Sequence, residues 1–144
     1  MRILLLCLLL ALLPTTAFAQ EAPVGSWITI DDNTGKPKSV IDIYKSSDGT
    51  LAGRVVEVLQ SDRGPNPVCE RCRGDRKNQP VEGMVILWGM KRAGDSWEAG
   101  RILDPSSGSI YSARLRTIEG GKRLELRGFR GFSLLGRTQV WVRQ

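Results

Sequence analysis

The chain of 144 residues is 41% hydrophobic and carries 21 basic against 15 acidic residues, a formal net charge of +6. This length suits one globular domain with one core. The sequence contains no histidine, which excludes the Ser-His and Cys-His nucleophile pairs and the commonest zinc ligand. We therefore expect a protein that is not an enzyme, with no catalytic residues, no cofactor and no metal site.

The N-terminus has the pattern of a secretory signal peptide. Arg2 precedes an apolar run shorter than the ~20 residues that span a bilayer, and a small-x-small site follows at residues 17–19. We predict export to the periplasm or the cell exterior, cleavage after Ala19 and one domain over residues 20–144. An uncut membrane anchor is the alternative. Cys7 would be lost with the peptide, leaving Cys69 and Cys72 in an oxidising compartment.

The rest of the chain alternates apolar and polar residues in short runs, which is typical of β-strands. We predict eight strands, over residues 25–31, 39–46, 51–60, 82–92, 96–104, 109–118, 123–129 and 138–143. Most links are short and rich in Gly, Asp and Ser, so sequential strands should pair directly. The pattern predicts an all-β, eight-stranded antiparallel up-and-down barrel, with a sandwich as the alternative.

One link is long, from residue 61 to 80, and it contains Cys69 and Cys72 among several arginines. A structureless loop of this length is uncommon in a compact domain unless something pins it. We expect a disulfide that staples the loop. A redox centre and half of a metal site remain open, although no helix pattern follows the pair and no further Cys or His completes a zinc site.

The basic residues are dispersed and mixed with acids, which indicates a solvated surface. We expect no nucleic-acid partner, and some attraction to an anionic envelope surface. The segment Asp31-Asp32-Asn33-Thr34-Gly35 combines two acidic residues with turn-forming Asn and Gly, which predicts a charged hairpin turn.

Aromatic and sulfur-containing residues on the predicted strands are the best indication of a ligand. An eight-stranded barrel is either filled by side chains or holds one small ligand. An inward arginine would meet an anionic head group, because a buried unpaired arginine is costly. The candidate ligand-binding residues are Tyr44, Trp88, Met90, Trp97, Tyr111, Arg114, Arg127 and Phe129.

Gly25-Ser26-Trp27 opens the first predicted strand, and Arg137 leads into the last. This resembles lipocalin-like (calycin) proteins, in which the Gly-x-Trp indole packs under an arginine of the last strand. The resemblance gives Gly25, Trp27 and Arg137 the role of closing the barrel. The blocks "CERCRGDRKNQPVEGMVIL" and "LELRGFRGFSLLGRTQVWVR" are also similar to a secreted bacterial family, domain of unknown function 2147. It implies a lipocalin-like barrel with no established enzymatic role.

These patterns lead to one favoured function and two alternatives. We expect an exported protein that holds a small hydrophobic or amphipathic ligand, anionic ones included, in a barrel cavity. An envelope interaction module with a filled barrel would instead use the 61–80 loop and the apolar loop near residues 130–136. A thiol oxidoreductase based on Cys69 and Cys72 is the third hypothesis.

Overall fold

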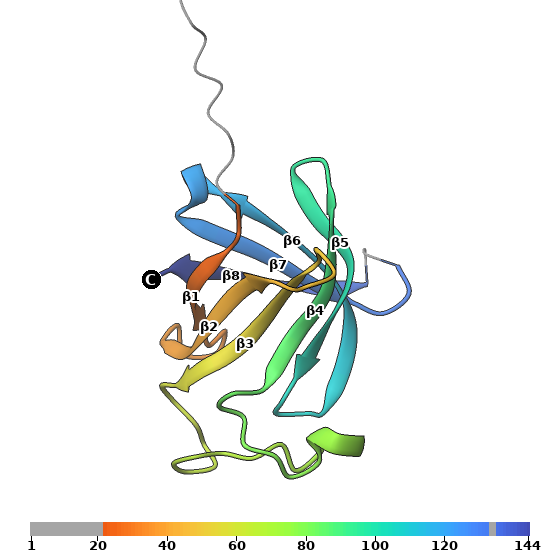
Figure 1. Ribbon diagram of the computed structural model, residues 1–144. Helices are drawn as coiled ribbons and strands as arrows, with labels where there is room; N and C mark the ends of the chain where they lie inside the picture. The colour runs from red at the N-terminus through yellow and green to blue at the C-terminus, as the bar shows by residue number, and fades with distance from the viewer. Residues whose placement is uncertain (1–21, 133–134) are drawn as a thin grey trace, which may run out of the picture.

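The computed structural model describes residues 22–132 and 135–144, and they form a closed barrel of eight antiparallel strands (Figure 1). Each strand pairs with the next, and β1 pairs with β8 to close the barrel. The strands are β1 (Gly25–Ile30), β2 (Pro37–Lys45), β3 (Leu51–Val58), β4 (Val85–Ala93), β5 (Ser96–Asp104), β6 (Ser109–Ile118), β7 (Arg123–Phe129) and β8 (Gly136–Arg143). The predicted up-and-down barrel is confirmed. The predicted signal peptide lies outside the described residues.

The strand limits follow the sequence pattern closely. Strands β5, β6 and β7 begin and end where the alternation predicted, whereas β2 and β8 each begin two residues earlier. Strand β4 begins later than predicted because Gly83 adopts a positive φ of 86° and Met84 N–H donates to the Val81 carbonyl. That turn occupies the residues that the apolar pattern assigned to the strand.

The core extends through the barrel and under the long loop, and we call its end around Trp27 and Met90 the floor. Inward residues of successive strands meet there, and each buried aliphatic or aromatic side chain contributes roughly 1.5–3 kcal/mol. The fully buried large side chains include Trp27, Ile41, Ile43, Leu51, Leu87, Met90, Leu115 and Leu124. Gly53 leaves room for this packing, because a Cβ there would lie 3.2 Å from Leu87 and 3.3 Å from Ile41.

Trp27 and Arg143 close the floor. The Arg143 guanidinium lies 4.2 Å from the centroid of the buried Trp27 ring, and Trp27 Nε1 donates to the Pro23 carbonyl at 2.8 Å. Arg143 also donates from Nε, Nη1 and Nη2 to the carbonyls of Gly121, Val24 and Ala22. Gly25 is needed beside this arginine, since a Cβ there would lie 2.9 Å from Arg143 Nη1.

The prediction that Arg137 covers Trp27 is wrong, and strand pairing explains why. Trp27 lies opposite Arg143 in the β1–β8 ladder, because antiparallel pairing brings the end of β8 to the start of β1. Arg137 is six residues earlier on β8, roughly 20 Å away at about 3.4 Å per residue. It forms an ion pair with Asp32 at the opposite end of the barrel.

The long β3–β4 loop folds on itself and carries the predicted disulfide between Cys69 and Cys72. Both cysteines are buried, Cys69 N–H donates to the Gln79 carbonyl, and a bridge joins Val68 to Pro80. A short 3₁₀ helix, η1 (Gly74–Arg76), lies between these two sides. The loop and the β5–β6 turn lie at the same end of the barrel (Figure 1).

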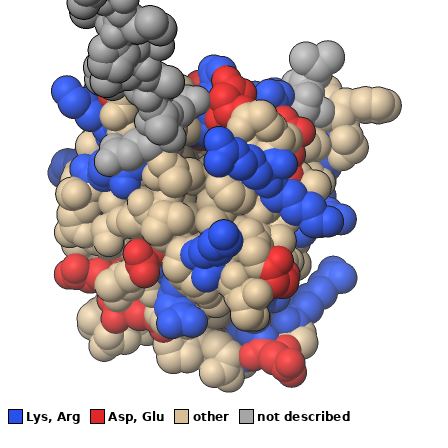
Figure 2. Space-filling model, turned by 45° about the horizontal axis from the view of Figure 1, so that its top comes forward, with Lys and Arg blue, Asp and Glu red and all other residues tan. Residues whose placement is uncertain are grey.

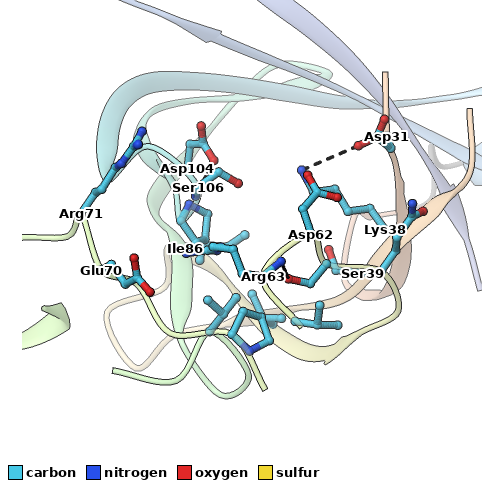
Figure 3. Close-up of a pocket in the computed structure, with 17 residues that line it drawn as sticks. Asp31, Lys38, Ser39, Asp62, Arg63, Glu70, Arg71, Ile86, Asp104 and Ser106 are labelled. Atoms are coloured by element: carbon cyan, nitrogen blue, oxygen red, sulfur yellow. Dashed lines mark hydrogen bonds and ion pairs between the residues drawn. The ribbon is translucent and has the colours of Figure 1, made fainter. Parts of the chain in front are cut away.

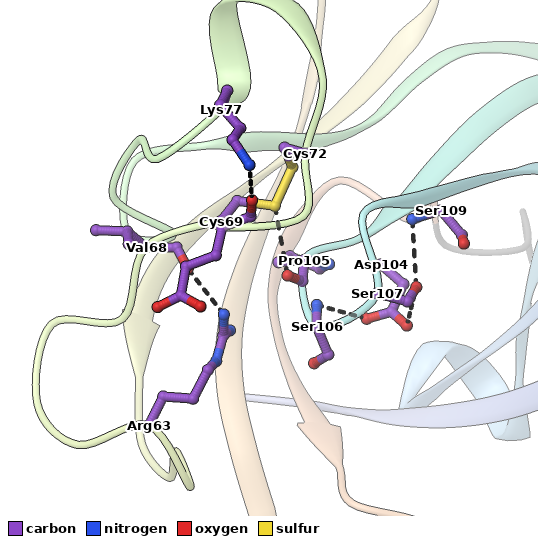
Figure 4. The surroundings of a disulfide bond; sticks show 11 residues. Arg63, Val68, Cys69, Cys72, Lys77, Asp104, Pro105, Ser106, Ser107 and Ser109 are labelled. Atoms are coloured by element: carbon purple, nitrogen blue, oxygen red, sulfur yellow. Dashed lines mark hydrogen bonds between the residues drawn. A yellow bond between two sulfur atoms is a disulfide. The ribbon is translucent and has the colours of Figure 1, made fainter.

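Figure 4 shows how the disulfide rests on the β5–β6 turn. Cys69 Sγ lies 3.4 Å from the Pro105 carbonyl oxygen, a van der Waals contact because a disulfide sulfur carries no hydrogen. A Cβ on Gly108 would lie 2.1 Å from the Arg71 carbonyl oxygen, so only glycine fits there. The loop is therefore held against the turn by close backbone contact as well as by its own hydrogen bonds.

Basic and acidic side chains are interspersed on the outer surface that Figure 2 shows, and they form no large field of one sign. Exposed ion pairs such as Arg114–Glu98 and Arg116–Glu125 join neighbouring strands. No helix within residues 22–132 and 135–144 is long and apolar enough to cross a bilayer.

Candidate functional site: the barrel mouth

The end of the barrel opposite the floor, the mouth, is hollow. A cavity of about 910 Å³ enters here between the β1–β2, β5–β6 and β7–β8 links. Its apolar lining comes from four strands, namely Ile86 of β4, Ile102 and Leu103 of β5, Leu126 of β7 and Trp141 of β8. Thr29 and Ser39 add a hydrogen-bonded hydroxyl pair, with 2.7 Å between Oγ1 and Oγ.

A smaller hollow of about 320 Å³ adjoins the cavity beneath the β3–β4 loop (Figure 3). The two spaces share several lining residues, among them Lys38, Ser39, Ile86 and Asp104. The loop adds polar side chains to its wall, including Asp62, Arg63, Glu70 and Arg71. The mouth thus combines an apolar chamber with a polar side chamber.

A chain of polar contacts runs from the interior to the rim along β8. Trp141 Nε1 donates to Gln139 Oε1 at 3.3 Å, and Gln139 Nε2 donates to Asp32 Oδ2 at 3.4 Å. The same carboxylate forms the ion pair with Arg137. This chain ties the β1–β2 turn to β8 and satisfies the buried indole.

Asp31 holds the β1–β2 turn in shape at the rim. Its carboxylate accepts hydrogen bonds from the backbone N–H groups of Thr34 and Asn33, each at 2.9 Å. The Thr34 backbone bond is the main reason why the pKa of Asp31 is lower than usual. Lys38 lies 4.0 Å from the same carboxylate. The predicted charged turn is therefore present, with Asp31 ionised at neutral pH.

The candidate ligand residues divide between the cavity, the core and the outer wall. Tyr111 and Phe129 line the cavity. Met90 is fully buried in the core, and Trp97 packs against the core without lining either hollow. The remaining four, Tyr44, Trp88, Arg114 and Arg127, line neither hollow.

Contacts on the outer wall account for these four residues. Arg54 lies 5.5 Å from the Tyr44 ring centroid, and Arg76 of the long loop lies 4.6 Å from the Trp88 ring centroid. Arg114 pairs with Glu98 at 3.1 Å. Arg127 donates to Thr138 Oγ1 at 2.8 Å, and it alternates with the buried Leu126. The prediction that these residues face the ligand is wrong.

Sequence reasoning missed the aliphatic wall, Gln139, Gly128 and Arg130, all of which line the cavity. Strict alternation on β7 was a usable signal, because buried Leu124 and Leu126 put Gly128 on the same inner face. Arg130 lies just beyond the strand, where alternation no longer applies.

The cysteine pair is a formed disulfide, so in this state neither sulfur is available to a metal. Within the part of the chain that the structure describes, no three Cys, Asp or Glu residues gather as a metal site.

Comparisons with known proteins agree with this architecture. The chain is similar to the solved structure of protein HP1028 from Helicobacter pylori, described as belonging to the lipocalin family, with a TM-score of 0.72 and 18% identity. The match covers 85% of this chain and 83% of that one, and it shows a shared lipocalin-like fold. No curated protein matches the sequence. The family model "Uncharacterized protein conserved in bacteria (DUF2147)" matches residues 25–143, and the chain belongs to this family.

Proposed function

We propose that the protein binds a small hydrophobic or amphipathic molecule in its mouth cavity. The observation that carries the proposal is an open, apolar-walled space of about 910 Å³ with charged groups at its rim. Ligand pockets in proteins usually have volumes of about 300–1,000 Å³, apolar walls and a few polar groups. The site would hold its ligand without converting it chemically.

In this proposal the floor of the barrel provides stability and the mouth binds the ligand. The packed floor keeps the barrel rigid, so the cavity exists before the ligand arrives and little ordering is needed on binding. Each CH₂ group moved from water to the wall of Ile102, Leu126 and Trp141 would contribute roughly 0.8 kcal/mol. The charged and polar side chains at the rim of the cavity let a head group keep hydrogen bonds.

The alternative of an interaction module assumed a filled barrel. The hollow mouth favours the ligand-binding proposal over that alternative. The thiol oxidoreductase hypothesis is also less favoured, because both cysteines of the long loop are buried and therefore shielded from a substrate.

Gly128→Leu tests the proposal by filling the cavity. A Cβ at Gly128 would lie 3.6 Å from Ile102 and 3.7 Å from Tyr111, ordinary contact distances, and the cavity provides space beyond them. We expect the variant to fold and to lose at least about tenfold in affinity for the neutral fluorescent probe N-phenyl-1-naphthylamine, because the leucine occupies the probe's space.

Ser112→Leu is the matched control, since Ser112 lies on the adjacent strand and does not line the cavity, and its hydroxyl accepts a 3.4 Å bond from Arg101. It should bind the probe as the parent does. Equal probe binding by all three proteins, or no binding by the parent, would refute the proposal. If the parent binds the probe, native mass spectrometry of protein purified from its own cells would identify any retained molecule.

We also propose that the protein works outside the cytoplasm, on the basis of the N-terminal sequence pattern. Intact mass measurement on protein from the periplasmic and culture fractions tests this. Export with cleavage predicts a chain that begins at Gln20, and a chain that begins at Met1 in the cytoplasm would contradict it.

A further inference from the structure

We propose that Arg130 recognises the head group of the ligand, and that the ligand is an amphiphile with one anionic group, such as a carboxylate or a phosphate. This inference rests on the proposed function. It is based on how the charged groups around the cavity are paired. The charged lining residues are Asp31, Asp32, Asp104, Lys38, Arg130 and Arg137.

All three carboxylates of the cavity are already engaged. Asp31 accepts bonds from the β1–β2 turn, and Asp32 pairs with Arg137 and Gln139. Asp104 accepts bonds from Ser106 N–H at 2.9 Å and Ser107 Oγ at 2.8 Å. A cationic ligand would have to compete with these partners.

Two of the three cations are engaged as well. Arg137 pairs with Asp32, and Lys38 lies 4.0 Å from Asp31. Arg130 differs, because its contact is with the Tyr111 ring, whose centroid lies 4.9 Å from the guanidinium carbon. Within residues 22–132 and 135–144, no carboxylate pairs with Arg130. It is therefore the cavity cation that is most available to an incoming anion.

The contact with Tyr111 also positions the guanidinium. A ring beneath the guanidinium restricts the motion of its plane and leaves its N–H edges available. These edges match a carboxylate or a phosphate with two parallel hydrogen bonds. Lysine would supply charge at this place without the same two-point geometry.

The apolar wall begins directly beside this arginine. Tyr111 lies next to Gly128, and Gly128 lies next to Ile102, because a Cβ on Gly128 would be 3.7 Å from Tyr111 and 3.6 Å from Ile102. An anion held by Arg130 at the rim would thus leave its attached chain against the apolar wall. The head and tail of one amphiphile are accommodated together.

Isothermal titration with decanoate, decyl phosphate and neutral 1-decanol tests the inference. The alkyl chain of decanoate is one CH₂ group shorter than that of the other two probes, which is about a fourfold effect against decanoate. A preference of about tenfold for the anions therefore reports the head group. We expect the parent protein to bind either anion about tenfold more tightly than the alcohol, the lower end of what hydrogen bonds to a charged group contribute. Arg130→Gln should reduce that ratio to near one, because the anions lose far more affinity than 1-decanol does.

Two further variants separate recognition from net charge. Arg123→Gln removes one positive charge from the outer wall of β7, where Arg123 pairs with Glu119, and should keep the parent's ratio. Arg130→Lys should keep part of it. The inference is overturned if Arg123→Gln and Arg130→Gln lower the ratio equally, or if the parent binds all three probes alike.

The outcomes also distinguish this inference from the proposed function. Equal binding of anions and alcohol, abolished by Gly128→Leu, would overturn the role of Arg130 and leave the cavity as a binding site. No binding of any probe would overturn both. A preference for decyl phosphate over decanoate, or the reverse, would support the inference and identify the source of the anion.

Discussion

The floor and the mouth each hold an arginine against an aromatic ring, and the two arginines have different surroundings. At the floor, Arg143 covers Trp27 and uses its N–H groups on three backbone carbonyls. At the mouth, Arg130 covers Tyr111 and forms no ion pair with any carboxylate of the described residues. The same ring contact therefore belongs to a structural site, where the N–H donors are used, and to the recognition site that we propose, where they are available.

Two glycines show the same contrast in packing. A Cβ on Gly25 at the floor would lie 2.9 Å from Arg143, whereas a Cβ on Gly128 at the mouth would make only ordinary contacts. The floor is packed around Arg143 and Trp27, whereas the mouth keeps space beside Gly128. We therefore expect substitutions at the floor to reduce stability and substitutions at the mouth to reduce ligand binding.

The largest expected effect comes from removing the floor arginine. Arg143→Gln should lower the free energy of unfolding by about 2–3 kcal/mol, because carbonyls lose charged hydrogen-bond partners and Trp27 loses its cover. Arg137→Gln at the mouth should lower it by less than about 1 kcal/mol, because that ion pair is exposed. Urea denaturation of both variants measures the difference, and equal losses would contradict the contrast.

A smaller effect is expected where the long loop meets the β5–β6 turn. Gly108→Ala and Gly49→Ala both place alanine at a positive φ, of 71° and 85°, so both carry a left-handed cost of about 1–2 kcal/mol. Only Gly108→Ala also forces the new methyl group against the Arg71 carbonyl. We expect it to be about 2 kcal/mol less stable than Gly49→Ala in thermal or urea unfolding.

If the two glycine variants unfold at the same denaturant concentration, the loop moves away without cost and does not brace the mouth. In that case Gly108→Ala should also leave binding of N-phenyl-1-naphthylamine unchanged. A loop that braces the mouth predicts that both quantities change together.

The smallest effect concerns two turn aspartates at opposite ends of the barrel. The pKa of Asp31 is lowered mainly by the Thr34 backbone bond, and the pKa of Asp48 mainly by the Thr50 hydroxyl. A lowered folded-state pKa contributes stability above the unfolded value of about 4, and this is lost as the pH falls through the folded value. Asp31→Asn and Asp48→Asn should each lower the melting temperature slightly at neutral pH, and by less near about pH 2.5.

Binding distinguishes the two aspartates. Asp31 lines the cavity, whereas Asp48 belongs to the β2–β3 turn at the floor end. Decanoate affinity should therefore change in Asp31→Asn and stay constant in Asp48→Asn. A change in both variants would indicate that binding follows overall stability and that the mouth is not a separate region.

The fold was predictable because alternation and short turns determine it locally. Pairs such as Ile41 and Ile43, or Leu124 and Leu126, indicate one inner face each, and short links leave few ways to connect the strands. The disulfide was predictable from two cysteines three residues apart. The sequence could also have identified Arg143, in place of Arg137, as the arginine that covers Trp27, because antiparallel closure places the end of β8 beside the start of β1.

The site was less predictable because it depends on side-chain direction and on residues beyond the strands. Arg114 and Arg127 looked suitable by type, yet they lie opposite each other in the β6–β7 ladder. On the outer wall Arg114 pairs with Glu98, and Arg127 donates to Thr138. Trp88 lies on the outer face, opposite Arg101 in the β4–β5 ladder, and a loop residue, Arg76, covers it there. A contact between segments far apart in the sequence cannot be predicted from a local sequence pattern.

The hydrogen bond from Trp141 to Gln139 makes the fluorescence of Trp141 sensitive to changes at the mouth. Gln139 also contacts Asp32 on the β1–β2 turn, so displacement of that turn would alter the polarity around the Trp141 indole. The other three tryptophans would provide a constant background, because Trp27 lies in the floor, where its indole donates to the Pro23 carbonyl, and Trp88 and Trp97 line neither hollow. Occupancy of the mouth should therefore be readable from intrinsic emission without any attached dye.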